Sequence, residues 1–274
     1  MDRMNIGDDA FMRSGHTYIM GILNVTPDSF SDGGRYDSVN EALKRARQMV
    51  MEGADLIDVG GESTRPGYEK ISDEEEIERV VPVIEAIKRH MDIPVSVDTY
   101  KASVAKAALE AGADLVNDIW GLKYDPEMAH VIAENGAACC LMHNRETADY
   151  ENFIEDCLND LKESIQIAKA AGIRDDKIIL DPGVGFGKTY EQNLLVLKHL
   201  DKFKSLGYPV LLGTSRKSVI GLTLDLPTEE RLEGTLATTV MGVMAGMSFV
   251  RVHDVEANSR VIAMAEAILK IQGE

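Results

Sequence analysis

Polar side chains that could bind a small ligand stand at the ends of short apolar runs along the chain. Carboxylates accept hydrogen bonds from ring N–H groups and amines, amides offer both polarities, and arginine, lysine and histidine can hold an anion. Taken singly, each could be a structural cap or half of a buried ion pair. A core tolerates so many polar groups only where a ligand or water satisfies them, so together they indicate a binding site. Its candidate residues are Asn24, Asp58, Asp98, Asn117, Asp118, His143, Asp181, Ser215, Lys217, Arg251 and His253.

The apolar runs that carry these residues have the length of buried strands, and segments of helical periodicity lie between them. Residues 39–51, 74–89, 102–111 and 154–171 are the clearest helical segments. Strands that alternate with helices predict a parallel sheet, because parallel neighbours need long crossover connections. The eight predicted strands are residues 18–24, 56–58, 94–98, 115–117, 138–143, 178–181, 210–215 and 249–253.

Glycines precede several of the strands, at the position where a left-handed residue ends a helix. The sequence Gly-Ala-Asp-Leu occurs twice, at 53–56 and 112–115, and marks a repeated unit. Eight such units favour a single α/β domain, a (β/α)₈ TIM barrel over residues 17–274 after an N-terminal extension of residues 1–16. Periodicity alone leaves an open doubly wound sheet as the alternative. In a barrel the carboxyl ends of the strands converge, so the polar strand-end residues should share one site.

The composition restricts the classes of partner. The chain has 46 acidic residues against 29 lysines and arginines, a formal charge of −17, which argues against nucleic acid or an anionic membrane. An anionic substrate would therefore need a local basic cluster. Neither a secretory signal nor an apolar stretch of the ~20 residues that cross a bilayer is evident. Cys139, Cys140 and Cys157 lack the spacing of metal or redox motifs, so we expect a cytoplasmic protein with reduced, buried cysteines.

Motifs at these strand ends, in order along nearly the whole chain, resemble the dihydropteroate synthase family. Residues 20–34 together with 60–67 are similar to its paired loop signatures. Each motif alone is modest evidence, whereas the ordered set is specific. The resemblance supports the barrel and makes residues 17–274 a pterin-binding domain. The further matches are 96–99 (Ser-Val-Asp-Thr), 116–119 (Val-Asn-Asp-Ile), 181–187 (Asp-Pro-Gly-Val-Gly-Phe-Gly), 213–217 (Gly-Thr-Ser-Arg-Lys) and 251–254 (Arg-Val-His-Asp).

The resemblance implies a transferase of folate biosynthesis that condenses 6-hydroxymethyl-7,8-dihydropterin diphosphate with 4-aminobenzoate to give 7,8-dihydropteroate and diphosphate. The implied mechanism is substitution at the pterin methylene, in which diphosphate departs first or nearly so and the arylamine attacks a delocalised cation. An arylamine is neutral at pH 7, so no strong general base is nominated, and electrostatic stabilisation carries the reaction. Sulfonamides, which mimic aminobenzoate, are the implied inhibitors.

The resemblance also assigns the pterin site. Asp181 and Asn117 resemble the residues that read the pterin edge, and Asp98 the carboxylate that favours positive charge on the ring. Lys217 resembles the donor to the pterin carbonyl region, and Arg251 the guanidinium that lies against the ring. Of these, Asp98, Lys217 and Arg251 are the implied catalytic residues.

The implied diphosphate pocket consists of Arg251, His253 and Asn24, which supplies the local basic cluster that the acidic composition requires. Arg251 and His253 are two positions apart and therefore point to the same side of a strand. Asn24 resembles the family's Mg²⁺ ligand, with diphosphate oxygens and water completing the shell, so the metal is expected only with diphosphate bound.

The implied environment of the second substrate combines strand-end residues with the two long loops, which we interpret as lids over the site. For the first loop, an ordinary solvated connection is the alternative. Arg216 is a weaker candidate for the aminobenzoate carboxylate. The residues that resemble this environment are Thr64, Arg65, Phe186 and Ser215, with Phe30 and Pro66 delivered by the loops.

Other functions were weighed against the synthase. Residues 183–189, Gly-Val-Gly-Phe-Gly-Lys-Thr, mimic a phosphate-binding loop, but Pro182 stands where a Walker A motif needs glycine. These glycines more simply permit close approach of the pterin. A folate-dependent methyltransferase would share Asp98 and Asn117 without needing the diphosphate set, and a silent homologue would bind pterin without turnover. Because no matched position departs from the family pattern, the synthase is favoured.

Some features receive no functional role. Asp58, Asp118 and His143 stay unassigned. The methionines at 241, 244 and 247 are interpreted as a packed helical face. A homodimer through the late helices is an expectation from the family alone.

Overall fold

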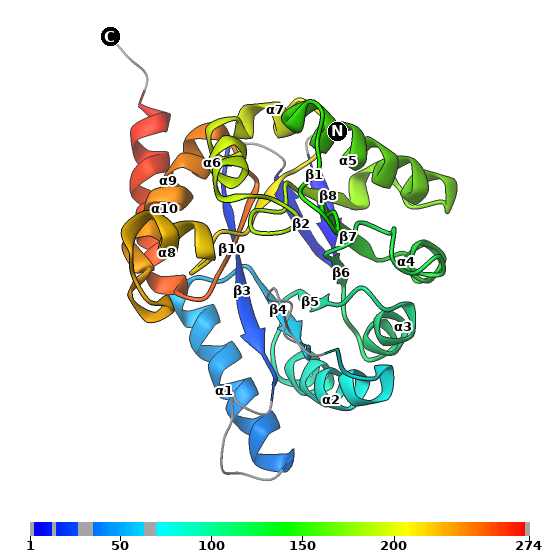
Figure 1. The fold of residues 1–274 in the computed structure, drawn as a ribbon. Coiled ribbons are helices and arrows are strands. Elements are labelled where there is room, and N and C mark those ends of the chain that lie inside the picture. The colour runs from blue at the N-terminus through cyan, green and yellow to red at the C-terminus, as the bar shows by residue number, and fades with distance from the viewer. Residues whose placement is uncertain (1–2, 13–14, 27–34, 63–69, 272–274) are drawn as a thin grey trace.

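Eight parallel strands close into a barrel in the computed structural model, which describes residues 3–12, 15–26, 35–62 and 70–271 (Figure 1). The hydrogen-bonded order is β8-β7-β6-β5-β4-β3-β10-β9, and a parallel bridge between Leu180 and Val210 joins the two ends. The closed barrel is thereby confirmed and the open doubly wound sheet excluded. The strands are β3 (Tyr18–Asn24), β4 (Leu56–Gly60), β5 (Val95–Asp98), β6 (Leu115–Asp118), β7 (Ala138–Met142), β8 (Ile178–Asp181), β9 (Leu211–Leu212) and β10 (Phe249–Val252).

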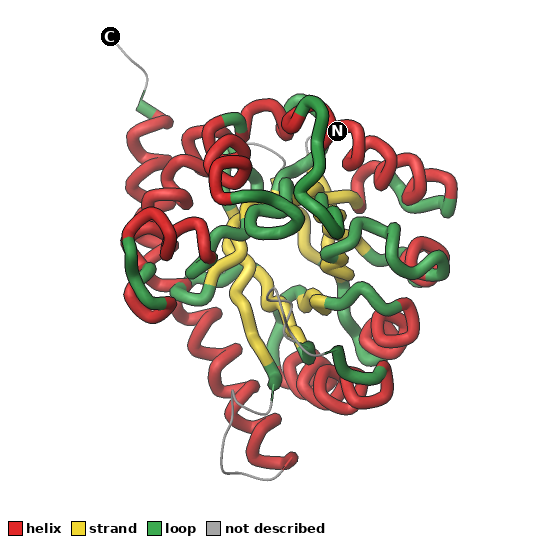
Figure 2. Tube along the Cα trace, viewed as in Figure 1, coloured by secondary structure: helices red, strands yellow, loops and turns green. Residues whose placement is uncertain are grey.

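Helices surround the barrel on the outside (Figure 2). None of the helices in the described part of the chain has both the length and the apolar content that a bilayer crossing requires. They are α1 (Arg35–Glu52), α2 (Asp73–His90), α3 (Ala102–Glu110), α4 (Met128–Glu134), α5 (Phe153–Ala170), α6 (Tyr190–Lys198), α7 (Leu200–Lys204), α8 (Ser218–Leu224), α9 (Leu232–Ala245) and α10 (Val255–Lys270), with short 3₁₀ turns η2 (Asp175–Lys177) and η3 (Thr228–Glu230).

The two copies of the Gly-Ala-Asp-Leu sequence have the same structural role: each ends a helix and binds the neighbouring strand. Gly53 and Gly112 each have φ of +105°, which ends the preceding helix as predicted. The aspartate two residues later turns back to the neighbouring strand: Asp55 accepts from the Ile19 amide at 2.7 Å and Asp114 from the Val95 amide at 2.8 Å. Each unit is therefore fastened to the strand before it in the barrel.

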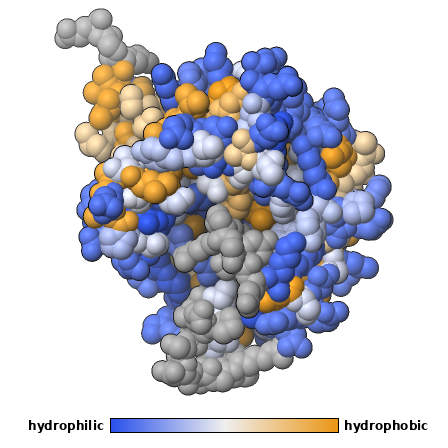
Figure 3. Space-filling model, viewed as in Figure 1, coloured by the Kyte–Doolittle hydropathy of each residue, from blue (hydrophilic) through white to orange (hydrophobic). Residues whose placement is uncertain are grey.

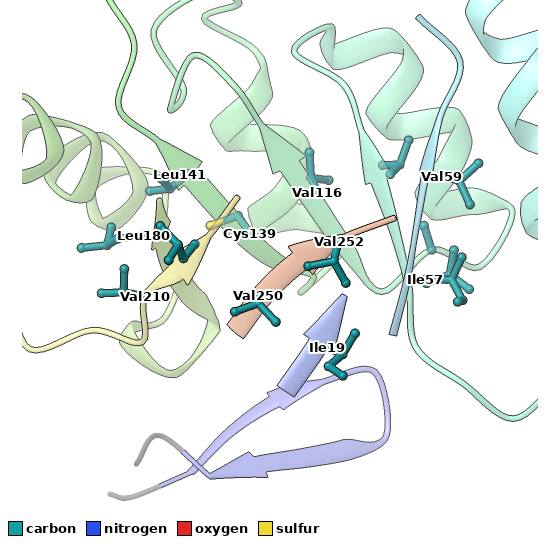
Figure 4. Close-up of a cluster of buried hydrophobic side chains, with 14 of the residues drawn as sticks. Ile19, Ile57, Val59, Val116, Cys139, Leu141, Leu180, Val210, Val250 and Val252 are labelled. Carbon is teal, nitrogen blue, oxygen red and sulfur yellow. The ribbon is translucent and has the colours of Figure 1, made fainter. Parts of the chain in front are cut away.

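Strand alternation separates two cores. One set of side chains faces the helices, and ten of its members, including Ile57, Val59 and Val250, are labelled in Figure 4. The opposite set fills the barrel interior at the amino ends of the strands, where Met20 and Phe249 are fully buried. Residues two apart on a strand share a face, so the polar residues next to the helix-facing set point inward at the other end.

The N-terminal extension closes the bottom of the barrel. Strands β1 (Arg3–Ile6) and β2 (Asp9–Met12) form an antiparallel hairpin that the sequence did not predict. Phe11 packs edge-on against Tyr18, with ring centroids 4.8 Å apart, and against Phe249 at 5.6 Å. The amino end of the barrel is sealed, which leaves the carboxyl ends of the strands as the place for a site.

Candidate active site

A cavity of about 700 Å³ lies at the carboxyl ends of the strands, a size that suits a small organic ligand. Its lining includes the residues with an assigned role that the structure describes: Asn24, Asp98, Asn117, Asp181, Phe186, Ser215, Lys217, Arg251 and His253. The unassigned candidates Asp58, Asp118 and His143 do not line it. Thr64 and Arg65, like Phe30 and Pro66, lie outside the described residues. As expected, the carboxyl ends of the strands bring the polar groups of the lining together in one cavity.

Arg251 holds two buried carboxylates across the mouth of the barrel. Its Nε donates to Asp58 Oδ2 at 2.6 Å, and its Nη2 donates to Asp98 Oδ2 at 2.7 Å. Asn117 Nδ2 also donates to Asp58 Oδ2, at 3.3 Å. Asp58, to which the sequence assigned no role, is fully buried and does not line the cavity, so it orients Arg251 and Asn117 from behind.

Asp98 keeps one carboxylate oxygen available. Its Oδ1 is buried and has no hydrogen-bond partner among the described residues. Burial raises the pKa of Asp98 to about 7, against the lowering effect of the Arg251 charge. A buried acceptor without a partner is costly, so a ligand donor is the natural complement of this oxygen.

Asp181 and Lys217 converge on the backbone of Gly213. A Cβ at Gly213 would lie 3.6 Å from Asp181 Oδ2 and 3.7 Å from Lys217 Nζ, so both polar groups lie over this glycine. Burial lowers the pKa of Lys217 to about 8, opposed by the charge of Asp181. Lys217 Nζ donates to the Val184 carbonyl at 2.5 Å and lies 4.7 Å from the centre of the Phe186 ring.

A second group of cavity-lining residues has the polar atoms that could hold an anion. Ser215 Oγ lies 2.9 Å from His253 Nδ1 and accepts from the His253 amide at 3.1 Å. Asn24 lines the same cavity and, with Arg251, completes the predicted basic and amide set. Arg216 also lines it, but its guanidinium donates twice to Asp254, at 2.6 and 3.0 Å. The charge of this weaker candidate is therefore already shared with a carboxylate.

Apolar walls were missed by sequence reasoning. Ile22, Ile119 and Met142 line the cavity although each looks like a core residue at the end of its strand. Asp118 fixes one of these walls: its carboxylate accepts from the backbone amides of Trp120 at 2.8 Å and Leu122 at 2.7 Å. Asp118 thus shapes the turn that follows β6 rather than touching a ligand. The sequence did offer one signal for these walls, because the apolar residues stand close to predicted polar site residues along the chain.

His143 belongs to a buried chain of hydrogen bonds behind the cavity. Its Nδ1 lies 2.8 Å from Lys188 Nζ and its Nε2 lies 3.0 Å from Asp160 Oδ2. The lysine donates to Nδ1, so Nε2 carries the proton that is donated to Asp160. Arg145 donates to both oxygens of Asp160, at 2.6 and 3.1 Å. Burial lowers the pKa of His143 to about 4, which keeps the ring neutral.

Comparisons with known proteins identify the family of the chain. The family model described as "Pterin binding enzyme" matches residues 20–253. The dihydropteroate synthase of Clostridium beijerinckii is 62% identical over 268 residues, which cover 97% of this chain and 100% of that protein. A crystal structure of the dihydropteroate synthase from Clostridium difficile, determined with pteroic acid, has a TM-score of 0.92 at 52% identity and covers 94% of this chain and 99% of that one. The Xanthomonas albilineans enzyme, solved with 4-aminobenzoic acid, has a TM-score of 0.93 at 38% identity and covers 99% of both chains.

We predict that His143 makes a contribution to the stability of the fold that is lost as the pH falls from about 6.5 to about 4. The folded pKa of His143 lies below its ordinary value, so in this window the unfolded chain binds a proton that the folded chain does not. The His143 side chain is fully buried, and a gap from 6.5 to about 4 corresponds to on the order of 3 kcal/mol. Urea unfolding between pH 4 and 7 measures the slope.

His143→Gln keeps a donor and an acceptor but cannot titrate. The unfolding free energy of this variant at pH 4, relative to pH 6.5, should therefore exceed that of the wild type by on the order of 3 kcal/mol. The exposed His130 gives the matched control, and His130→Gln should leave the slope unchanged. An equally steep slope in His143→Gln and the wild type would contradict the assignment.

Proposed function

The chain belongs to the dihydropteroate synthase family of pterin-binding enzymes, and we propose that its strand-end cavity binds a dihydropterin diphosphate and 4-aminobenzoate together. The enzyme is a transferase that forms 7,8-dihydropteroate and releases diphosphate. The observation that carries the residue assignments is the buried Asp98 oxygen, which has no partner among the described residues and belongs to a cavity that Arg251 and Lys217 also line. Such an acceptor suits a heterocycle rich in N–H groups.

The pterin is assigned to the acidic and amide part of the cavity. Asp181 Oδ1 accepts from the Gly183 amide at 2.7 Å, and its second oxygen faces the cavity floor at Gly213. That oxygen can accept from a ring N–H or the exocyclic amine, and Asn117 can both donate and accept. Lys217 is placed to donate to the pterin carbonyl. Ile119 and Met142 supply apolar walls for the ring faces.

The diphosphate is assigned to Arg251, His253 and Asn24, which line the same cavity. Asn24 offers one amide oxygen, and no group of three or more histidine, cysteine or acidic side chains forms a metal site among the described residues. This donor set fits Mg²⁺ that is held by Asn24 together with phosphate oxygens and water. When bound, Mg²⁺ would neutralise the negative charge of the leaving group.

The chemical step depends on electrostatic stabilisation of the developing charges and needs no strong base. The bond between the pterin methylene and the diphosphate oxygen breaks, and its electrons leave with diphosphate. The Asp98 carboxylate favours the positive charge that develops on the ring, while Arg251 stabilises the leaving group. The neutral arylamine forms the new C–N bond and then loses a proton to solvent. Asp98, Lys217 and Arg251 are the proposed catalytic residues.

The second substrate is assigned to Ser215 and Phe186, together with Thr64 and Arg65, which lie outside the described residues. Phe186 and Ser215 both line the cavity, and Phe186 lies against Lys217. A sulfonamide that mimics aminobenzoate should compete here. We further propose that the enzyme works in the cytoplasm, where its three free, buried cysteines remain reduced.

A homodimer through α8, α9 and α10 is the proposed assembly. Met241 and Met244 are 45% and 67% exposed, so their interpretation as a packed face was wrong, and only Met247 is buried. Hydrophobic surface gathers over α9 and α10 in Figure 3. A second copy of the chain is the partner that such a patch suits. The patch comprises Leu222, Leu224, Met241, Met244, Met264, Ile268, Leu269 and Ile271.

Purified protein should release diphosphate only when pterin diphosphate, 4-aminobenzoate and Mg²⁺ are all present. EDTA should abolish turnover and added Mg²⁺ should restore it, because Asn24 alone cannot hold the ion. Coupled detection of diphosphate, with dihydropteroate measured by chromatography, gives the result. Pterin binding without product would instead identify a silent homologue.

Asp181→Ala should weaken pterin binding about 100-fold, since hydrogen bonds to a charged group contribute about 1.5–3 kcal/mol. Arg251→Ala should lower kcat/KM for the diphosphate ester by more than it lowers affinity for the same pterin without diphosphate. Calorimetry and steady-state kinetics separate the two effects. Arg174→Ala, at a 71% exposed side chain, is the control, and wild-type kinetics in both site variants would refute the assignments.

Replacing Met244 and Ile268 together by glutamate should halve the mass measured by light scattering, from twice the 30.1 kDa chain mass to once that value. Charges in an apolar interface lose solvation without gaining a partner. Met51→Glu, at an 82% exposed methionine on α1, should leave the mass unchanged. A wild-type monomer would rule out the dimer.

A further inference from the structure

The lysine of the glycine-rich segment 183–189 is not needed by the function described so far. Lys188 does not point toward the cavity. Its Nζ donates to the carbonyl of Gly183 at 2.8 Å, to that of Phe186 at 3.0 Å, and to His143 Nδ1 at 2.8 Å. One ammonium group therefore gathers carbonyls of its own loop and ties the loop to the end of the neighbouring strand.

These bonds occupy the three donors that an ammonium group has. Burial lowers the pKa of Lys188 to about 7. A charged Lys188 therefore destabilises the fold unless its hydrogen bonds offset the lost solvation of the ammonium group. His143 in turn is hydrogen-bonded to Asp160, and Asp160 accepts a hydrogen bond from Arg145. The loop is thus anchored through this chain of hydrogen bonds to Arg145, which follows β7, and to Asp160 of α5.

Close backbone packing reinforces the anchor. A side chain at Gly183 would overlap the His143 carbonyl, and one at Gly187 would overlap the carbonyl of Arg145. Both glycines have positive φ, +69° and +54°, so the loop is wound tightly against its neighbour. Tyr150 OH donates to the Gly187 carbonyl at 2.7 Å and holds the far end of the loop.

The same loop presents three groups to the cavity. The Gly183 amide orients Asp181 at 2.7 Å, the Val184 carbonyl accepts from Lys217, and Phe186 lines the wall. Lys188 holds the carbonyls of Gly183 and Phe186, which lie on either side of Val184. A shift of this loop would move parts of both assigned substrate sites together.

We propose that Lys188 is a positioning residue, which through its bonds to the Gly183 and Phe186 carbonyls and to His143 sets the place of Phe186 for the arylamine substrate. It touches no substrate itself. This proposal rests on the proposed function, because the arylamine site is assigned there.

Lys188→Met should raise KM for 4-aminobenzoate about tenfold, the effect of losing roughly one ordinary contact, while kcat changes less than about threefold. A residue that only supported the fold would lower the unfolding temperature and the active fraction, and so apparent kcat, with KM unchanged. That second pattern would overturn the proposal. Lys198→Met removes an exposed lysine from α6 and should leave both constants at wild-type values.

Tyr150→Phe provides a second variant that removes one hydroxyl and leaves Lys188 in place. Because Tyr150 holds the same loop at Gly187, this variant should raise KM for 4-aminobenzoate in the same direction by a smaller factor. If Lys188→Met fails to fold, the result with Tyr150→Phe decides, and an unchanged KM there would refute the role of the loop.

Fluorescence tests the loop without turnover. Trp120 is the single tryptophan, and it packs with Phe186 against the cluster of Tyr100, Ile119 and Met142. Loosening of Phe186 in Lys188→Met should increase quenching of Trp120 by acrylamide in the substrate-free protein. If quenching increases in Lys188→Met but the wild-type protein has no synthase activity, only the proposed function is refuted. If the wild-type protein is active but quenching in Lys188→Met is unchanged, the role of Lys188 is refuted.

Discussion

The bridge that Arg251 makes between Asp58 and Asp98 is the interaction on which the site depends. Asp58 is completely buried, and a carboxylate there is tolerable only with a cation beside it. The same guanidinium reaches Asp98 and so joins residues of β4, β5 and β10 across the barrel mouth. The two carboxylates share one guanidinium, which leaves Asp98 Oδ1 for a ligand, and the positive charge lies in the cavity that Asn24 and His253 also line.

The barrel makes this arrangement possible by separating its two ends. At the amino end, Phe11 of the hairpin and Phe249 fill the interior with apolar groups. At the carboxyl end, the inward positions between helix-facing residues such as Val250 and Val252 are polar. Strand alternation then requires Arg251 to face inward, because its neighbours are buried on the outside. The apolar packing at the amino end stabilises the barrel that holds the charged groups at the carboxyl end.

Local periodicity predicted the strands, the helix-ending glycines and the convergence of the polar strand ends, because these follow from spacing within single elements. Partnerships between distant elements did not follow from it. The role of Asp58 depends on Arg251, which is 193 positions later, and the charge of Arg216 is shared with Asp254 from another strand end. Exposure of Met244 likewise depends on what packs beside α9. The hairpin at the amino end was missed because its apolar residues are few and lie far from any motif.

The glycine-rich segment shows why a motif needs its structural context. In a phosphate-binding loop, backbone amides turn inward to surround an anion and a lysine adds its charge. Here carbonyls of Gly183 and Phe186 turn inward instead, and the lysine satisfies them. The same residue types thus build a site with the opposite polarity, filled by the chain's own cation. Because Lys188 is occupied in this way, the anion site that we propose is left to Arg251 and His253, which line the cavity as Lys188 does not.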